Sequence, residues 1–560
     1  MDRDLQDSLM AWTGGGPVEE ERLAALLERL RTDATFRVAF TEEIRVLGML
    51  KAAQSPEPRW LDLADELGAP IDAPVADHAF ADAVMDKIVV PPRGLLTRLA
   101  PTLALAAAVT LLAGAIAWRM MRPSPSINPT PVAASATPAP VLAVISQAGA
   151  AQGFTCDGKE LHEGDPVLPG RLRLKSGTAT LSFFNGATMY LEGESDLDLV
   201  SMEKVACRVG RLHVRAEGGA QGFTVTGPRV AVVDLGTEFG FNVGSDGRSA
   251  VHVFEGQVEA SLLTPEGYTL RSELLDKDQS ATALAGAGRL ERDTLSAGDF
   301  AAAHPLPVRP LPLKSEYPTS VLAAKPWGYW RFEGIENGLA QNEVAGGFPL
   351  RISGALTLGD EGTENHALRF PSASDAYAIM DGTWQPESGQ DYAIEAWVMP
   401  ESVRLSALVS LIADEPLEKP EKHYFLLQLM DRSQRWLHPN GSIRFLHRSP
   451  PGGSGGVNAF ADHPYIPGRW HHLVAQKVGT RLELYVNGRL AGEALADADS
   501  AAGAYRLLLG RLKQSQRVRL ADARPFVGRL DEVALYDHAL TPAEISRHAA
   551  LGSITPDAPH

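Results

Sequence analysis

The chain has 560 residues, too many for one hydrophobic core, and its length predicts about three or four units. Its 69 Asp and Glu residues against 52 Lys and Arg give a net charge of -17, which argues against direct nucleic-acid binding. Cys156 and Cys207 are its only cysteines, so neither a disulfide-dense scaffold nor a four-cysteine zinc site is available.

Residues 1–94 have the apolar spacing of helices. Pro17 suits a first helical position, and leucines then recur at i, i+3, i+4 and i+7 from Leu23 to Leu30. Two further apolar stripes run over 36–47 and 60–67. We therefore expect a small α-helical segment, close to the lower size limit for independent folding.

A transmembrane helix is predicted at 98–119. The run from Leu99 to Trp118 contains no charge and would span about 30 Å as a helix, the thickness of a bilayer's hydrocarbon core. Arginines flank the run on both sides, and Trp118 sits where an interfacial aromatic residue belongs. The flanking charges are nearly balanced, so they do not orient the helix.

A Pro-rich spacer at 120–140 is followed by an antiparallel all-β domain at 141–290. Here apolar residues recur at every second position, as in β-strands. Asn185-Gly186 and Asp246-Gly247 have the composition of hairpin turns. The residues expected to share buried faces are Ala179, Leu181, Phe183, Ala187, Met189, Leu191, Phe239, Phe241, Val243, Val251 and Val253.

Two groups of carboxylates in this domain invite a chemical interpretation. Asp234 and Glu238 would share a face of a straight strand, but no nucleophile or basic partner lies nearby in sequence, so a structural role is favoured. The second group is a row of four carboxylates at every second position, which places them on one face of a strand. Their oxygens are candidate ligands for weak calcium binding, although a solvated polar face is favoured. This row is Glu192, Glu194, Asp196 and Asp198.

The stretches GFTV, VVDLGTEFG and VFEGQVE, in this order and spacing, resemble the FecR family over roughly 141–263. One departure is Gly227-Pro228, where many relatives have Thr-Pro. The resemblance implies a single-pass regulator of an extracytoplasmic-function sigma factor, with its N-terminus in the cytoplasm and its C-terminus in the periplasm. It also implies structural roles for Asp234, Leu235, Gly236, Thr237, Glu238, Phe239, Phe254, Glu255 and Gly256.

A second Pro-rich spacer is predicted at 291–320, before another β-rich unit at 321–552. Ala393, Glu395 and Trp397 alternate with Ile394 and Ala396, and the strand from Leu482 to Val486 leads into an Asn-Gly turn. The stretches GRWHHLVA, LYVNG and GRLDEVALYDHALTPAEI resemble the LamG-like, concanavalin A-type family. That resemblance implies a two-sheet jelly roll that binds carbohydrate, protein or calcium.

No catalytic residue and no obligatory cofactor are expected in this jelly roll, and calcium is the one ion considered. Retaining glycosidases need two carboxylates about 5–5.5 Å apart, and the Glu395 strand has no second acid beside it. His471 and His472 are adjacent in sequence and should point to opposite faces of a strand, which disfavours a shared metal.

We therefore expect a multidomain, non-enzymatic signalling protein of the bacterial inner membrane. Its periplasmic domains would sense a glycan or an envelope or outer-membrane protein, and its cytoplasmic segment would regulate a sigma factor. The alternative is an envelope adhesion or carbohydrate-binding scaffold without signalling. For Cys156 and Cys207 a disulfide and two free thiols stay open, because pairing needs Cα atoms within about 7 Å.

Overall fold

The computed structural model describes residues 140–552 apart from short gaps at 150, 217, 284–288, 293–294, 305, 360–364, 373–374, 417–420, 433–437, 498–502 and 515–520. The predicted helical segment at 1–94, the predicted transmembrane helix at 98–119 and the first spacer up to residue 139 lie outside the described residues. Within the described ranges, no helix has the length and apolar character needed to cross a membrane.

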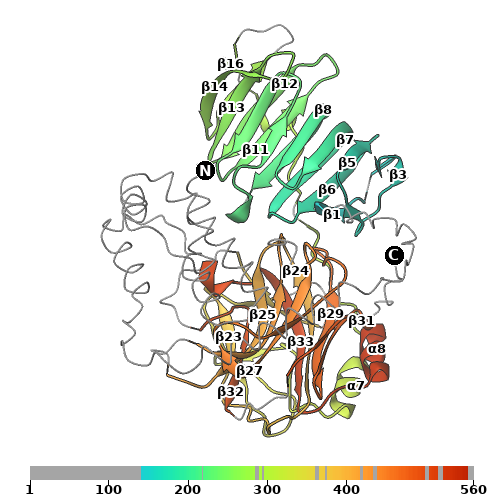
Figure 1. The fold of residues 1–560 in the computed structure, drawn as a ribbon, viewed down its shortest axis with the longest axis vertical. Helices are drawn as coiled ribbons and strands as arrows, with labels where there is room; N and C mark the ends of the chain where they lie inside the picture. Colours follow the sequence, from blue (N-terminus) through green and yellow to red (C-terminus); the bar gives the residue numbers. More distant parts are fainter. Residues whose placement is uncertain are drawn as a thin grey trace, which may run out of the picture. The chain divides into compact units, whose positions relative to one another are not determined.

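Residues 143–292 form one sheet of 16 strands (Figure 1, cyan to green). Its main path is β14-β13-β10-β9-β8-β11-β12-β15-β16, and β7 joins β5 and β6 to β8. The strands are β1 Ala143–Gln147, β2 Thr155–Cys156, β3 Lys159–Glu160, β4 Pro166–Val167, β5 Gly170–Leu174, β6 Thr178–Phe183, β7 Ala187–Ser201, β8 Lys204–Ala216, β9 Thr224–Thr226, β10 Val230–Asp234, β11 Glu238–Val243, β12 Ser249–Glu255, β13 Gln257–Leu263, β14 Thr269–Asp276, β15 Ser280–Ala283 and β16 Glu291–Arg292.

Both predicted hairpins of this domain are confirmed. Asn185-Gly186 joins β6 to β7, Asp246-Gly247 joins β11 to β12, and both glycines have a positive φ. The left-handed conformation suits glycine, which has no Cβ to clash. All the apolar residues expected to share buried faces lie in one hydrophobic core.

Residues 328–536 form a two-sheet sandwich (Figure 1), as the predicted jelly roll requires. An eight-stranded sheet, β21-β22-β33-β24-β29-β30-β31 with β17 on β33, packs against a nine-stranded sheet, β18-β19-β20-β23-β32-β25-β26-β27-β28. The first sheet comprises β17 Gly328–Trp330, β21 Thr357–Gly359, β22 Ala367–Phe370, β24 Tyr392–Pro400, β29 His471–Val478, β30 Arg481–Val486, β31 Arg489–Leu495 and β33 Gly528–Tyr536.

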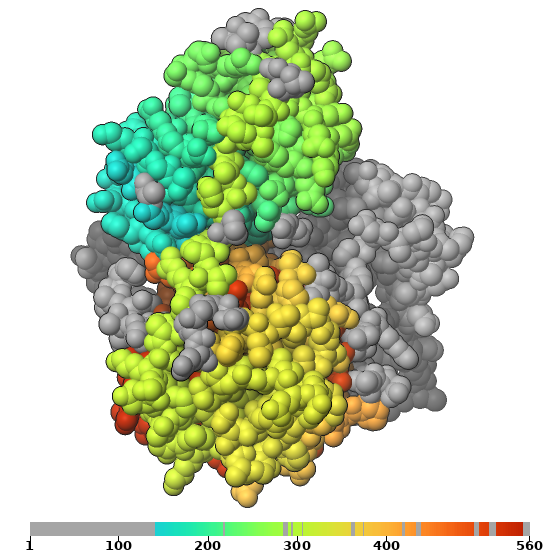
Figure 2. Space-filling view, turned by 180° about the vertical axis from the view of Figure 1, so that it is seen from behind, coloured from blue at the N-terminus to red at the C-terminus, as the bar shows by residue number. Residues whose placement is uncertain are grey.

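The second sheet comprises β18 Ile335–Glu336, β19 Leu339–Ala340, β20 Leu350–Ser353, β23 Tyr377–Met380, β25 Ser406–Ala413, β26 His423–Leu429, β27 Ile443–Gly452, β28 Val457–Phe460 and β32 Tyr505–Leu509. Ile394 and Ala396 of β24 point into the core between the sheets, as their alternation predicts. Figure 2 shows the surface of both β regions from behind, coloured along the sequence.

Two helices cover the other face of β24. The helices α7 Tyr317–Ala323 and α8 Pro542–Leu551 enclose Ala393 and Trp397 in a second core, so every residue of β24 is buried. The short 3-10 turns are η1 Gly218–Ala220, η2 Ala297–Asp299 and η3 Ala521–Ala523. Thr541 caps α8 by accepting a hydrogen bond from the backbone of Glu544.

The second spacer prediction, 291–320, is wrong at both ends. Residues after β16 lie across the FecR-like sheet, where Arg211 donates to the carbonyl oxygens of Gly298 and Phe300. Phe300 is 1% exposed and packs on Gly240, where an added Cβ would lie 2.4 Å from the ring. At the other end, Tyr317 begins α7 and is buried in the jelly roll. The Pro-rich composition of this segment gives no indication that Phe300 and Tyr317 are buried.

Candidate functional site

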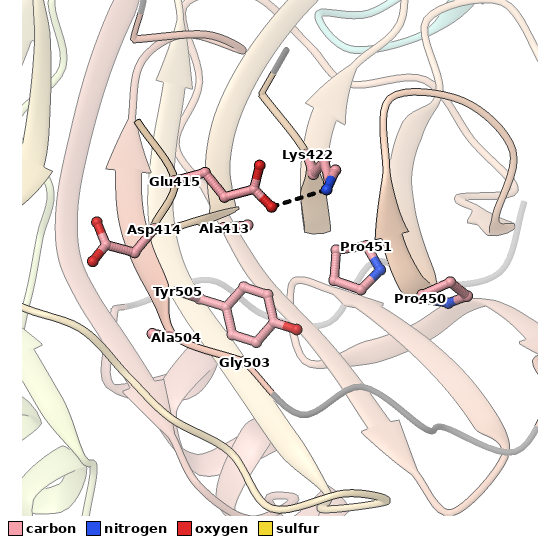
Figure 3. Close-up of a pocket in the computed structure, with 9 residues that line it drawn as sticks. All are labelled: Ala413, Asp414, Glu415, Lys422, Pro450, Pro451, Gly503, Ala504 and Tyr505. Carbon is pink, nitrogen blue, oxygen red and sulfur yellow. Dashed lines mark hydrogen bonds and ion pairs between the residues drawn. The ribbon is translucent and has the colours of Figure 1, made fainter. Parts of the chain in front are cut away.

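A hollow opens where strands of the nine-stranded sheet end. It has a cavity volume of about 350 Å³, within the range of small-molecule sites. Lys422 Nζ donates to Glu415 Oε1 at 2.9 Å on one side of the hollow, while Asp414 points away (Figure 3). Its described lining is Ala413, Asp414, Glu415, Lys422, Pro450, Pro451, Gly503, Ala504 and Tyr505. Two proline rings and one ion pair give it both apolar and charged contacts, the mixture that orients a polar ligand.

Glu395 lies in a fully buried hydrogen-bond network and cannot reach a ligand. It has no exposed surface, and His472 Nε2 lies 2.7 Å from its Oε1. Tyr317 and Tyr536 donate their hydroxyls to it at 3.0 and 2.7 Å, and His548 Nδ1 lies 3.0 Å from Oε1. These partners come from α7, α8, β29 and β33, so the network joins the helices to the sheet.

In this network the charge of Glu395 is balanced by His548. Burial alone would raise the pKa of Glu395, but the charge of His548 and the hydrogen bonds from His472 and His548 outweigh burial and hold that pKa well below its usual value. Burial lowers the pKa of His548, and Glu395 more than reverses that effect, so the net shift is upward. Glu395 and His548 therefore form a charged pair inside the fold, and this pair has a structural role.

Asp531 and Glu532 form a second buried acidic group. Asn365 donates to Asp531 at 2.7 Å, Arg331 Nε donates to Glu532 at 3.2 Å, and the Tyr329 hydroxyl also donates to Glu532. Glu532 has a φ of +50° at an irregularity in the pairing of β33 with β24. Burial raises the pKa of Glu532 to about 7. Both side chains are 0% exposed, so neither faces a ligand groove.

His471 and His472 point in opposite directions, as expected. His472 contacts Glu395, whereas His471 Nε2 lies 3.1 Å from the backbone nitrogen and oxygen of Ile466. Across the described ranges, no group of three or more His, Cys, Asp or Glu side chains is arranged to hold a metal ion.

The expectation that Asp234 and Glu238 share a strand face is wrong, because the chain turns between them. Asp234 ends β10 and is fully buried, accepting hydrogen bonds from the Gly236 amide at 2.9 Å and from the Thr237 hydroxyl. Burial raises the pKa of Asp234. Leu235 lies at the turn and is 45% exposed. Asp234 therefore stabilises a turn through its side chain.

Glu238 begins β11 and forms an ion pair on the sheet. His213 Nε2 lies 2.7 Å from one of its oxygens, and Arg215 Nε donates to the other at 3.0 Å. The hydrogen bond from His213, together with Arg215, outweighs burial and lowers the pKa of Glu238 to about 2. Phe254 stacks on the His213 ring with centroids 4.6 Å apart.

The remaining FecR-like motif residues shape two adjoining turns. Phe239 is fully buried, and the exposed Glu255 lies opposite Glu238 in the β11–β12 ladder. Gly256 has a φ of +78°, and a Cβ there would lie 2.8 Å from the carbonyl oxygen of Gly236. The glycines allow the two turns to pack backbone against backbone.

Three of the four carboxylates considered for calcium lie against arginines. Glu192 bonds Arg211 at 3.0 Å, Asp196 bonds Arg171 at 2.7 Å, and Asp198 pairs with Arg208. Glu194 lies at an exposed position of the same strand, β7. Calcium would have to displace these guanidinium groups, so the row serves as a set of cross-strand ion pairs.

The disulfide left open by the sequence does not form. Cys156 and Cys207 are both free, and Cys207 is buried. Cys156 pairs with Leu172, Leu172 with Leu197, and Leu197 with Cys207, so the cysteines are three strand spacings apart. Three spacings are about 14 Å, well beyond the reach of a disulfide.

Two sequence families match the chain. The family described as FecR protein matches residues 173–259, and the Concanavalin A-like lectin/glucanases superfamily matches residues 371–546. No curated protein matches the chain.

Similar solved structures include domain 4 of AbnA, a GH43 extracellular arabinanase from Geobacillus stearothermophilus, in complex with arabinotriose. It is 19% identical, with a TM-score of 0.30, over 40% of this chain and 98% of that one. A heptameric SAP-like pentraxin from Limulus polyphemus is 16% identical, with a TM-score of 0.26, over 32% of this chain and 80% of that one. The matched families establish that the chain combines a FecR domain with a concanavalin A-like, LamG-type domain.

Proposed function

We propose that this protein is a single-pass regulator of the bacterial inner membrane. Residues 1–94 would act on an extracytoplasmic-function sigma factor in the cytoplasm, and the FecR and lectin-like domains would lie in the periplasm. The observation that carries this proposal is the FecR match at 173–259, which follows a charge-free run at 99–118 long enough to span a bilayer.

In this proposal the lectin-like domain binds a glycan or an envelope protein and leaves it unchanged. Support comes from the buried carboxylates Glu395, Asp531 and Glu532, which are 0% exposed and bonded to internal partners. A general acid or nucleophile must contact its substrate, and these groups are enclosed by the fold. The hollow lined in part by Glu415, Lys422 and Tyr505 is our candidate ligand site.

Topology tests the proposal. In the full-length chain, we expect a reporter joined ahead of Asp2 to be active only if it is a cytoplasmic reporter, and a reporter joined after His560 to be active only if it is a periplasmic reporter. Matched expression of both fusions in the membrane fraction is the control. A periplasmic N-terminus would contradict the proposal. A chain with the expected topology that binds no sigma factor would instead favour the adhesion or scaffold alternative.

A further inference from the structure

A short segment after β16 lies across the sheet of the FecR domain, and side chains of the sheet hold it by its backbone. We define the strap as residues 297–302. Arg211 donates to the carbonyl oxygens of Gly298 and Phe300 at 2.6 and 2.8 Å. Asn242 donates to the carbonyl oxygen of the residue between them at 2.8 Å. The strap lies outside the strands, so it can open without breaking the β-ladder.

His213 of β8 holds the strap at Ala301. Its Nδ1 lies 3.1 Å from the carbonyl oxygen of Ala301, and its Nε2 lies 2.7 Å from Oε1 of Glu238. Both neighbours are acceptors, because a carbonyl oxygen has no proton and the hydrogen bond from His213, together with Arg215, lowers the pKa of Glu238 to about 2. A neutral imidazole has a single N–H and can donate to only one of them. Both contacts are therefore hydrogen bonds only when the ring carries two protons.

The charged and titratable groups around His213 come from several elements. Arg215, on the same strand, shares Glu238 with it, since Arg215 Nε donates to the other carboxylate oxygen at 3.0 Å. Phe254 of β12 stacks on the His213 ring, and His252 packs edge-on against that phenylalanine with centroids 4.7 Å apart. On this face of the sheet and on the strap, these groups are Tyr190, Glu192, Arg211, Arg215, Glu238, His252 and Asp299.

Near neutral pH the charge on this face is set by a histidine. Histidine is the side chain that ordinarily titrates between pH 5 and 8, whereas arginine stays charged and tyrosine stays neutral there. Burial, opposed in part by the charge of Asp278, lowers the pKa of His252, which keeps that ring neutral. Hydrogen bonds from Ser296 lower the pKa of Asp299, which keeps that carboxylate charged. The remaining histidine of the set is His213, the one that contacts the strap backbone.

We propose that the strap is a pH-sensitive latch of the FecR domain, closed while His213 carries two ring protons and open once one of them passes to solvent. The remaining proton stays on Nε2, where the charged Glu238 accepts it, so the lone pair of Nδ1 faces the carbonyl oxygen of Ala301. Two acceptors at this distance repel one another and leave a buried polar contact unsatisfied. Opening would add about 20 Å to the chain that leads into the lectin-like domain, because six extended residues span that length. This control goes beyond the proposed sigma-factor and glycan-binding roles and depends on neither.

Hydrogen exchange of the strap amides in the purified full chain tests the latch. The Phe300 amide donates to the Ala297 carbonyl oxygen at 3.2 Å and the Ala302 amide to Glu192 at 3.3 Å, so both report on closure. After correction for intrinsic exchange rates, we expect their protection to fall by about tenfold or more from pH 6 to pH 8, because a charge-assisted hydrogen bond is lost. Amides of β13, in the same domain, should keep constant protection over this range.

Variants separate the latch from general stability. His213→Gln has no ring proton to lose, so strap protection should no longer depend on pH, whatever its level. Glu238→Gln removes the carboxylate that favours the doubly protonated ring, so the midpoint of the fall should move to lower pH. His252→Gln is the matched control, because it replaces a second buried histidine of the same face, and it should keep the wild-type midpoint and size of the fall.

Equal corrected protection of the wild-type strap at pH 6 and pH 8 would overturn the proposal. So would a His213→Gln chain that keeps the wild-type fall, because another group would then control the strap. If His213→Gln lowers protection in β13, which marks unfolding of the domain, Glu238→Gln decides the question, and an unmoved midpoint rejects the latch.

Discussion

His548 Nδ1 lies 3.0 Å from Oε1 and 3.1 Å from Oε2 of Glu395, so helix α8 is fastened to strand β24 by a contact buried from solvent. Replacing Glu395 by Gln would leave His548 without its counter-charge and His472 without its carboxylate partner. We expect a loss of about 3–5 kcal/mol in the free energy of unfolding, typical of breaking a buried pair. Trp fluorescence during urea unfolding reports mainly on this domain, because six of the nine tryptophans of the chain lie between residues 327 and 470 and residues 141–292 contain none.

The control for this variant is Glu387→Gln, which changes an exposed side chain of the same domain and should alter stability by less than about 0.5 kcal/mol. Equal unfolding midpoints for Glu395→Gln and Glu387→Gln would contradict a stabilising role for the network.

The same contact predicts a pH dependence. The pKa of His548 is raised in the folded state, so its contribution to stability is complete below its unfolded pKa of about 6.5 and is lost as pH rises through the folded pKa. Glu395, with a lowered pKa, keeps its contribution throughout this range, because its loss begins only in acid. We therefore expect the stability difference between wild type and His548→Gln to shrink from pH 6 to pH 9.

Urea unfolding at several pH values, with His162→Gln as an exposed control, measures this difference. A difference that grows with pH would show that His548 is neutral in the fold and would refute the charged pair.

Thiol labelling checks the separation of Cys156 and Cys207. Burial raises the pKa of Cys207 to about 12, and burial followed by Asp157 raises that of Cys156. Thiolates react and thiols do not, so the half-buried Cys156 should label slowly in the folded protein, and Cys207 only after unfolding. Unreduced, unfolded protein should give two reactive thiols per chain. A count of zero with monomers on a non-reducing gel would contradict the register of β2, β5, β7 and β8.

Phe300 and Gly240 test whether the segment after β16 belongs to the FecR domain. Phe300→Ala should destabilise that domain by about 3–5 kcal/mol, because it empties a buried site. Gly240→Ala should also destabilise it by forcing the ring away, but should cost much less once the ring is gone. Limited proteolysis at the segment measures both effects, and additive effects in the double variant would place Phe300 elsewhere.

Local chemistry made part of the fold predictable. The turns at Asn185-Gly186 and Asp246-Gly247 and the alternation around Phe239 depend on neighbouring residues, so the sequence predicts them correctly. Helix α8 also has a local signal, since Thr541 and Glu544 have the spacing of a capping box.

Long-range contacts could not be predicted in the same way. Arg524 lies 96 residues from Gln428, and Arg211 lies 87 residues from Gly298, so no periodicity brings them together. The sequence around Glu395 does not indicate its partners, because His472 and His548 are 77 and 153 residues away. The turn between Asp234 and Glu238 is not predictable from the pattern, because the motif lies in an otherwise uninterrupted apolar alternation.

Co-purification of sigma factors with the full chain tests the proposed function most directly. The tagged full chain and a chain lacking residues 1–94 would be produced at equal levels in the native cell, and their bound proteins identified by mass spectrometry. We predict that an extracytoplasmic-function sigma factor is recovered with the full chain and is absent from the shortened one. Recovery with neither chain, or equally with both, would contradict a sigma-regulating role for residues 1–94.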